Sequence, residues 1–196
     1  MTAYDPAAAL VVVDLQNDFA DPAGGLYVRG GEEVVPLVSA EVAKARAAGA
    51  LVAYTQDWHP AETPHFAKDG GIWPVHCVRD TWGAELHPGL TVDGPVVRKG
   101  SAGEDGYSGF STRDPRTGER GDTELGALLG AGGVRRVVVV GLAGDYCVKE
   151  TALDAARLGY AVEVPLAATR FVALAEDDES AAVEALRAAG VTVRPA

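Results

Sequence analysis

The sequence predicts a three-layer α/β/α sandwich around a mainly parallel sheet of five or six strands, and three observations predict it. Four consecutive valines at 137–140 form the kind of apolar run found in central parallel strands, which are buried on both faces. Apolar residues at helical spacing follow this run, and Gly159 marks the end of that helix. Near the N-terminus, apolar runs at 8–13 and 50–55 flank a helical pattern at 32–48. This β-α-β alternation is typical of a parallel sheet with helices on both faces.

The other expected elements continue the alternation along the chain. We expect further strands at 94–98, 160–165 and 191–194. We expect further helices at 122–129 and 178–189. Asp122 is the expected N-cap of the first of these helices. Pro36 should lie near the first turn of the 32–48 helix, where a proline is tolerated. The stretches 101–121 and 167–172 are expected to be loops.

Composition narrows the classes of function. The 196 residues suit one domain spanning 1–196, and 47% apolar content is enough for a sizeable core. The net charge of −11, from 17 basic and 28 acidic residues, disfavours nucleic acid and anionic membranes as partners. Two cysteines and the absence of a signal-peptide pattern or membrane-spanning run favour a reducing cytoplasm.

Polar residues follow several predicted strands at the point where each strand ends. These residues are Asp14, Asp57, Lys99 and Cys147. Because the carboxyl ends of parallel strands meet at one edge of a sheet, where ligands bind, we expect the four side chains to converge there. An acid, a lysine and a cysteine together form a nucleophile with a base and a charge stabiliser. Taken singly, Asp14 is also typical of a turn cap, and Lys99 of a solvated surface.

Cys147 follows the glycine turn at Gly141 and Gly144 and falls in the first turn of the next helix. The unpaired N–H groups and the helix dipole at such a position favour a thiolate. Two alternatives remain open from these residues alone. A free cysteine is often a small buried hydrophobe, and a tight glycine turn is also typical of a phosphate cradle.

Three of the four histidines fall in one loop-like stretch after the second predicted strand. Asp57 and His59 stand two apart, so that their side chains point to the same side of an extended chain, and His65 and His76 follow. Imidazole and carboxylate ligands suit zinc, iron or manganese. The alternative is a set of hydrogen-bonding loop residues. Tyr107 and Phe110, in the 101–121 loop, are expected either to wall a pocket or to anchor the loop.

The sequence also resembles the isochorismatase-like cysteine hydrolases and, within them, the nicotinamidases (pyrazinamidases). The resemblance covers nearly the whole chain through the motifs LVVVDLQNDF, TQDWHP, WPVHC, VRKG, YSGF and GLAGDYCVKETALDA. The first and last motifs occur across the superfamily, whereas the D-x-H pair, the second histidine and WPxHC are more specific to nicotinamidases. One departure is Gly144, where the family most often has threonine.

The resemblance implies a role for each matching residue. It implies a catalytic triad of Asp14, Lys99 and Cys147. It implies metal ligands at Asp57, His59, His65 and His76, with His65 the least uniform position in the family. It implies an oxyanion hole from the N–H groups of Ala143 and Cys147, next to a cis peptide between Leu142 and Ala143. It implies ring-binding walls at Phe19, Trp73 and Tyr107.

The resemblance also implies the reaction. Nicotinamide would be hydrolysed to nicotinate and ammonia through a thioester on Cys147, with one divalent metal, zinc before iron or manganese, holding the pyridine nitrogen. The partner is then a small neutral aromatic amide, and a homo-oligomer is compatible with the sequence. Two alternatives are a related cysteine amidohydrolase that acts on another amide or ureido group, and a non-catalytic metal-binding module. A plain isochorismatase fits less well, because its substrate is dianionic.

Overall fold

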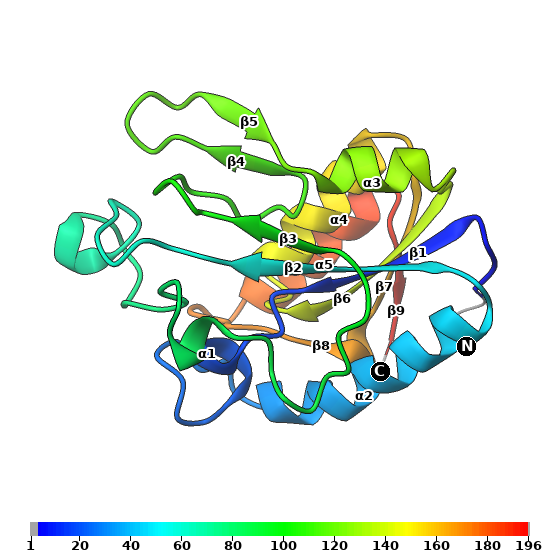
Figure 1. The fold of residues 1–196 in the computed structure, drawn as a ribbon, viewed down its shortest axis with the longest axis horizontal. Helices are drawn as coiled ribbons and strands as arrows, with labels where there is room; N and C mark the ends of the chain where they lie inside the picture. The colour runs from blue at the N-terminus through cyan, green and yellow to red at the C-terminus, as the bar shows by residue number, and fades with distance from the viewer. Residues whose placement is uncertain (1–3, 196) are drawn as a thin grey trace.

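The computed structural model describes residues 4–195 and has one large parallel sheet (Figure 1). Neighbouring strands follow the order β3 (Val96–Lys99), β2 (Leu51–Asp57), β1 (Ala8–Val13), β6 (Arg136–Leu142), β7 (Ala161–Pro165) and β9 (Thr192–Arg194). Every neighbouring pair in this order is parallel. A short seventh strand, β8 (Thr169–Arg170), also pairs with β6 in parallel. The predicted three-layer α/β architecture is confirmed, with one strand more than expected.

The two central strands separate two hydrophobic cores. β1 and β6 are aligned so that Val11 lies opposite Val139. Every residue of β1 is fully buried. Ala8, Leu10 and Val12 face one core, and Ala9, Val11 and Val13 face the other. Side chains alternate between the faces of a strand, so an unbroken apolar run such as this one requires a covering layer on both sides.

Helices supply both covering layers. α2 (Gly31–Ala47) packs on the face of Leu10 and Val12. α3 (Leu125–Ala131), α4 (Cys147–Arg157) and α5 (Asp178–Ala188) contribute to the opposite core. Pro36 lies inside α2, in its second turn and not in its first. None of the helices within residues 4–195 is long and apolar enough to cross a membrane.

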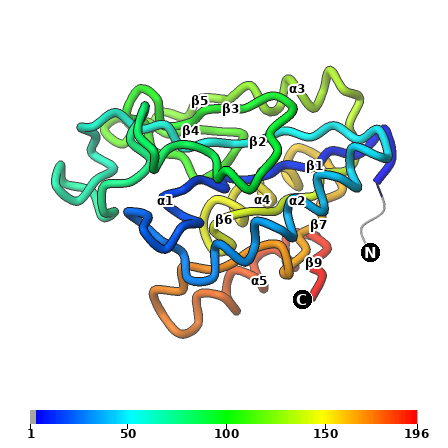
Figure 2. Tube along the Cα trace, turned by 60° about the horizontal axis from the view of Figure 1, so that its bottom comes forward, coloured from blue at the N-terminus to red at the C-terminus, as the bar shows by residue number. Residues whose placement is uncertain are grey.

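The segments that surround the site gather beyond the carboxyl ends of the strands. β1, β2, β3 and β6 all point to the left in Figure 1, and residues 58–80 lie on that side in Figures 1 and 2. This stretch holds the short helix η1 (Ala67–Asp69), and η2 (Trp82–Ala84) follows it against α1 (Asn17–Ala20). A third short helix, η3 (Leu166–Ala168), connects β7 to β8.

Two predicted loops contain regular structure. The 101–121 stretch carries the antiparallel hairpin of β4 (Ser111–Arg113) and β5 (Arg120–Asp122). Asp122 was expected to cap the next helix, which is wrong: it pairs with Ser111 at the end of β5, and α3 begins at Leu125 after Glu124. The 167–172 stretch contains β8, whose Thr169 hydroxyl donates a 2.7 Å hydrogen bond to the Gly141 carbonyl.

Candidate active site

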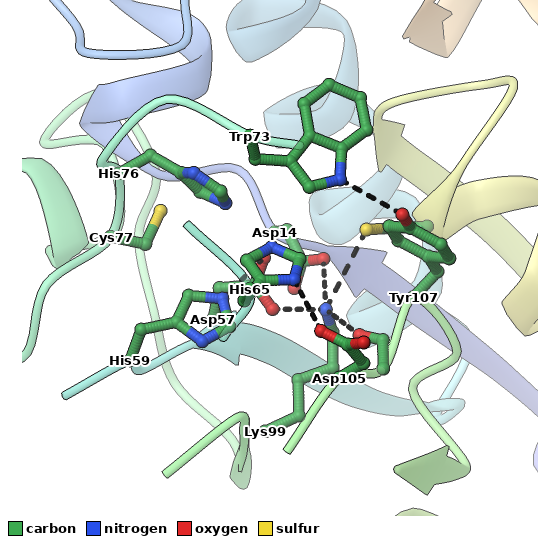
Figure 3. Close-up of polar contacts among 12 residues, drawn as sticks. Asp14, Asp57, His59, His65, Trp73, His76, Cys77, Lys99, Asp105 and Tyr107 are labelled. Carbon is green, nitrogen blue, oxygen red and sulfur yellow. Dashed lines mark hydrogen bonds and ion pairs between the residues drawn. The ribbon is translucent and has the colours of Figure 1, made fainter. Parts of the chain in front are cut away.

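The polar residues at the strand ends converge as expected. Asp14 follows β1, Lys99 ends β3, and Cys147 begins α4 after the turn that follows β6. Lys99 lies at the centre of these side chains (Figure 3). Its Nζ lies 2.9 Å from Oδ2 of Asp14 and 3.7 Å from Sγ of Cys147. We call Asp14, Lys99 and Cys147 the Asp–Lys–Cys group.

Asp57, the last residue of β2, stands next to this group. One of its carboxylate oxygens is ion-paired with Nζ of Lys99, and the other lies 3.9 Å from Nε2 of His59. The carboxylates of Asp14 and Asp57 and the sulfur of Cys147 all lie within 4.8 Å of one another. Asp57 therefore connects the Asp–Lys–Cys group to the histidines.

Two residues outside the predicted site hold Asp14 and Asp57 in place, one through a carboxylate and the other through the backbone. Thr55 donates its hydroxyl to Oδ1 of Asp14 at 2.7 Å. Gln16 donates to the Asp57 carbonyl and accepts the Asp57 N–H, both at 2.8 Å, so it fixes the end of β2 against the start of α1. The only sequence signal for these roles was position: Gln16 belongs to the DLQNDF motif, and Thr55 precedes Asp57 by two residues on one strand face.

Burial and the ion pairs set the charges of the group. Burial raises the pKa of Asp14, although Lys99 opposes this effect. Burial also disfavours ionised Asp57, but Lys99, His59 and His76 outweigh it and lower the pKa of Asp57 to about 2. Burial opposes the charge of Lys99 as well, yet Asp14 and Asp57 raise its pKa well above the usual value. Lys99 is therefore a fixed cation between the two carboxyl groups.

Cys147 is the first residue of α4, as expected, but burial acts against the thiolate that this helix position favours. Burial raises the pKa of its thiol well above the usual value, because it outweighs the opposing charge of Lys99. Cys77, the other cysteine, is also a free thiol and is fully buried in the core, with Sγ 3.9 Å from the Gly83 carbonyl.

The turn before Cys147 has the backbone that the resemblance implies. The Leu142–Ala143 peptide bond is cis. The N–H of Gly144 donates to the Arg170 carbonyl at 2.8 Å, which ties the turn to β8. A Cβ at Gly144 would lie 2.6 Å from the nearest atom of the Phe171 ring. The half-buried Phe171 ring therefore fills the space that a side chain at position 144 would need.

The three predicted histidines lie together next to Asp57 (Figure 3). We call His59, His65 and His76 the histidine cluster. The rings of His59 and His65 stack at 4.6 Å, and His76 lies 5.4 Å from His59. One ring nitrogen from each of the three lies within 4.8 Å of the others. Burial lowers the pKa of His59 to about 4 and also lowers that of His76, so both are neutral at neutral pH.

The hydrogen bonds of the cluster leave nitrogens available for a metal. Nδ1 of His65 bonds Asp105, and Nδ1 of His76 bonds the Pro74 carbonyl at 2.8 Å. Neither ring nitrogen of His59 has a hydrogen-bond partner within residues 4–195, although both are buried. Buried polar atoms are rarely left unpaired in a native fold. Neutral imidazoles with bare nitrogens, beside the Asp57 carboxylate, fit a divalent metal of the zinc, iron or manganese type.

A cavity runs between the two sets of residues and is walled by aromatic rings. Phe19, Trp73 and Tyr107 all line it, together with Ala143, Cys147 and the histidine cluster. Tyr107 accepts a 3.0 Å hydrogen bond from Nε1 of Trp73. Tyr146 also lines the cavity and meets the Trp73 ring edge-on at 4.9 Å. Sequence reasoning missed Tyr146, although it directly precedes Cys147.

The sequence left two roles open for the aromatic residues of the 101–121 stretch, a pocket wall or an anchor for the loop, and the structure places them differently. Tyr107 lines the cavity, whereas Phe110 is buried in the core with its ring stacked 6.3 Å from that of Tyr160. One is therefore a pocket wall and the other an anchor for the segment.

Known proteins resemble this chain throughout its length. The Isochorismatase domain family matches residues 8–196. A nicotinamidase/pyrazinamidase from Mycobacterium tuberculosis is 40% identical over 188 residues, covering 93% of this chain and 96% of the relative. The pyrazinamidase of Pyrococcus horikoshii in complex with zinc superimposes with a TM-score of 0.85 at 36% identity, covering 97% of this chain and 100% of that one. PnC1 from L. infantum in complex with nicotinate has a TM-score of 0.88 at 36% identity, over 99% and 96% of the two chains. The chain therefore belongs to the isochorismatase-like hydrolases, in the group of nicotinamidases and pyrazinamidases.

Proposed function

We propose that this protein hydrolyses the amide of nicotinamide, releasing nicotinate and ammonia, with Cys147 as the nucleophile. The single observation that carries the proposal is the shared cavity: the sulfur of Cys147 and the histidine cluster both line it, between aromatic walls. The relative from Mycobacterium tuberculosis, which is a nicotinamidase/pyrazinamidase, and the nicotinate in the L. infantum structure support the choice of substrate.

The cavity suits a flat, uncharged heterocycle. Phe19, Trp73 and Tyr107 supply aromatic faces and edges for a pyridine ring. A neutral ligand also avoids the repulsion that an anion would meet from a chain of net charge −11. His59, His65, His76 and Asp57 would hold a divalent metal, zinc before iron or manganese. Such a metal supplies a Lewis acid for the ring nitrogen.

Acylation begins at the thiol. Because the pKa of Cys147 is raised, its proton leaves as the sulfur attacks the amide carbon, and Asp14 accepts it. Lys99, at 3.7 Å from the sulfur, stabilises the negative charge that develops there. The N–H groups of Ala143 and Cys147 donate to the oxyanion of the tetrahedral intermediate. A donor of this kind typically contributes about 3–4 kcal/mol to transition-state stabilisation.

The same acid completes the cycle. Protonated Asp14 transfers its proton to the departing nitrogen as the C–N bond breaks, which releases ammonia and leaves a thioester on Cys147. Asp14 then takes a proton from water, which attacks the thioester carbon. The C–S bond of the tetrahedral intermediate then breaks, Asp14 returns its proton to the departing sulfur and restores the thiol of Cys147, and the acid product loses its proton to solvent and leaves as nicotinate. The raised pKa of Asp14 favours both directions of transfer, because a base nearer neutrality accepts and returns protons more readily.

The decisive experiment measures ammonia from purified protein supplied with nicotinamide. We expect release that stops after treatment with a strong chelator and returns when zinc, iron or manganese is added. Benzamide is the matched control substrate, since it has the same shape and lacks the ring nitrogen, and we expect it to react far more slowly. Equal rates for the two amides would show that the ring nitrogen does not contribute to binding or turnover.

The same assay separates the rival functions. No ammonia from nicotinamide together with release from a ureido compound would favour the related amidohydrolases. No turnover of either substrate by protein that still binds zinc would favour a metal-binding module. Other expectations stay predictions: one domain over 1–196, a cytoplasmic location, no nucleic-acid or membrane partner, and association of copies of the chain.

A further inference from the structure

Three consecutive residues of the 101–121 stretch each contact a different component of the site, and the contacts of Asp105 and Tyr107 can be followed in Figure 3. Oδ1 of Asp105 lies 2.6 Å from Nδ1 of His65. The carbonyl of Gly106 accepts a 2.9 Å hydrogen bond from Nζ of Lys99. The hydroxyl of Tyr107 accepts the hydrogen bond from Trp73. The segment 105–107 thus connects the histidine cluster, the Asp–Lys–Cys group and the aromatic wall.

The β4–β5 hairpin fixes the position of this segment. Asp105 and Arg113 form an antiparallel bridge, with Asp105 donating its N–H to the Arg113 carbonyl at 2.7 Å. Arg113 returns a 2.5 Å hydrogen bond from its own N–H to the Asp105 carbonyl. Arg113 in turn pairs with Arg120 of β5. The hairpin therefore determines where the Asp105 carboxylate lies relative to His65.

The contact with Asp105 determines which nitrogen of His65 carries hydrogen. An ionised carboxylate only accepts hydrogen bonds, so Nδ1 of His65 must be the donor at 2.6 Å. In the neutral ring, Nε2 is then bare and available as a ligand. His76 reaches the same state through the carbonyl of Pro74, two residues away on its own segment. His65 alone among the three depends on a side chain from another segment of the described chain.

We propose that Asp105 is a positioning residue for metal binding, which orients His65 and holds it in the tautomer with a bare Nε2. The inference deepens the metal site of the proposed function and rests on it. Carboxylates that accept the second nitrogen of a ligating histidine orient the ring and make it a stronger ligand, and their loss typically weakens metal binding about 10–100-fold. Asp105 has this relation to His65, although its side chain remains 37% exposed.

Zinc affinity of the variants tests the proposal directly. Zinc binding is measured by competition with a chromophoric chelator for the wild type and for Asp105→Ala, Asp105→Asn and Glu104→Gln. We expect Asp105→Ala to bind zinc about 10–100-fold more weakly. Asp105→Asn should lie between, because its amide oxygen still accepts a hydrogen bond but carries no charge. Glu104→Gln is the matched control: Glu104 accepts the N–H of Ala102, and its loss removes the same charge.

A second measurement needs no metal. Nitrogen-15 spectra of histidine in the metal-free protein at pH 8 distinguish the two neutral tautomers. We expect His65 to carry its hydrogen on Nδ1 in the wild type and in Glu104→Gln, and to shift toward the Nε2–H form in Asp105→Ala. This readout separates positioning from a general loss of structure, which far-ultraviolet circular dichroism and thermal unfolding report independently.

Different results would overturn the role of Asp105 and the metal site on which it rests. Zinc affinity of Asp105→Ala within twofold of the wild type, or an unchanged His65 tautomer, would overturn the role of Asp105. Should Asp105→Ala fail to fold, the comparison of Asp105→Asn with Glu104→Gln decides, and equal affinities would overturn it. Failure of the metal site is a different result: the wild type would bind no zinc, or zinc binding would survive removal of His59 and His76.

Discussion

The Asp–Lys–Cys group and the histidine cluster both contact Asp57 but are built in different ways. The Asp–Lys–Cys group stands at the ends of strands and at the first residue of a helix, and its charges contact one another directly. The histidine cluster comes from the irregular 58–80 stretch. Burial lowers the pKa of His59 and His76, which are therefore neutral, and both buried ring nitrogens of His59 lack a hydrogen-bond partner within residues 4–195.

The difference reflects how the two halves of the site, the Asp–Lys–Cys group and the histidine cluster, acquire their geometry. The parallel sheet places its strand ends during folding, so the Asp–Lys–Cys group is complete in the folded chain. The histidine cluster takes its arrangement from loop contacts, among them Asp105, and leaves open nitrogens for an ion to complete. We therefore expect the first half to depend on its own charges for stability and the second to depend on the metal.

The largest expected effect is the loss of turnover in Cys147→Ala. Removing the nucleophile of a catalytic group that acts as a unit costs about 10⁴–10⁶-fold in kcat. The histidine cluster is built separately, so zinc affinity should stay within twofold of the wild type. Cys77→Ala is the matched control, because Cys77 is a buried free thiol in the core. Ammonia release and chelator competition measure the two properties, and substantial turnover by Cys147→Ala would refute the assignment.

In the metal-free protein, we expect a substitution in the Asp–Lys–Cys group to reduce stability more than a substitution in the histidine cluster. Lys99→Met removes the cation between Asp14 and Asp57, all fully or nearly fully buried, and should lower the free energy of unfolding by about 3–5 kcal/mol. His59→Gln keeps a similar volume and breaks no hydrogen bond, so its cost should be on the order of 1 kcal/mol.

Urea unfolding of both variants, without metal and with zinc, provides the measurement. Zinc should stabilise the wild type and Lys99→Met, because it binds the folded state selectively, and should stabilise His59→Gln much less. Equal losses of unfolding free energy in the two metal-free variants would contradict this distinction. The Asp–Lys–Cys group would then depend on its charges no more than the metal-free histidine cluster depends on His59.

The same contrast explains which features could be predicted from the sequence. Asp14, Asp57, Lys99 and Cys147 were found because a residue at the carboxyl end of a parallel strand is placed by the sheet itself. Asp105 carried no such signal. Its position depends on the pairing of β4 with β5, strands of three residues each without a hydrophobic pattern.

Short elements account for the other differences. Asp122 has a side chain that suits an N-cap, but pairing with Ser111 draws it into β5. β8 has only two residues and is recognisable through its contacts, among them the Thr169 hydroxyl on the Gly141 carbonyl. Long, buried strands were predictable from local pattern, whereas these elements depend on tertiary contacts that no local pattern encodes.

As the pH falls, we expect the Asp–Lys–Cys group to lose activity before the histidine cluster loses its metal. Burial raises the pKa of Asp14 and lowers the pKa of His59 to about 4. Asp14 acts as a base only when ionised, so kcat/KM should fall about tenfold per pH unit below its raised pKa. Burial favours the neutral forms of both His59 and His76, so we expect zinc to remain bound where activity first declines. Profiles of kcat/KM and of bound zinc against pH measure both.

Thr55→Val gives this pH dependence a defined direction. The hydroxyl of Thr55 donates to Oδ1 of Asp14 and lowers its pKa, so its loss should raise that pKa further. The acid side of the kcat/KM profile should then move to higher pH, while the pH at which zinc dissociates stays unchanged. A shift to lower pH would mean that another group controls the acid side.

The smallest expected effect tests the packing of the turn before Cys147. A methyl group at Gly144 would lie 2.6 Å from the Phe171 ring, so the ring must move in Gly144→Ala. Overpacking of this kind costs about 1–3 kcal/mol, and the reduced entropy of the unfolded chain returns about 0.4–1 kcal/mol. We expect a net loss of about 1 kcal/mol in the free energy of unfolding.

The double variant decides whether the ring is the cause. In a Phe171→Ala background the methyl group meets no ring, so Gly144→Ala should be neutral or slightly stabilising. The coupling free energy from the four urea-unfolding curves should then be about 1 kcal/mol. Equal costs of Gly144→Ala in both backgrounds would show that the turn yields without the ring. The Asp–Lys–Cys side would then be less tightly packed than its network of buried contacts indicates.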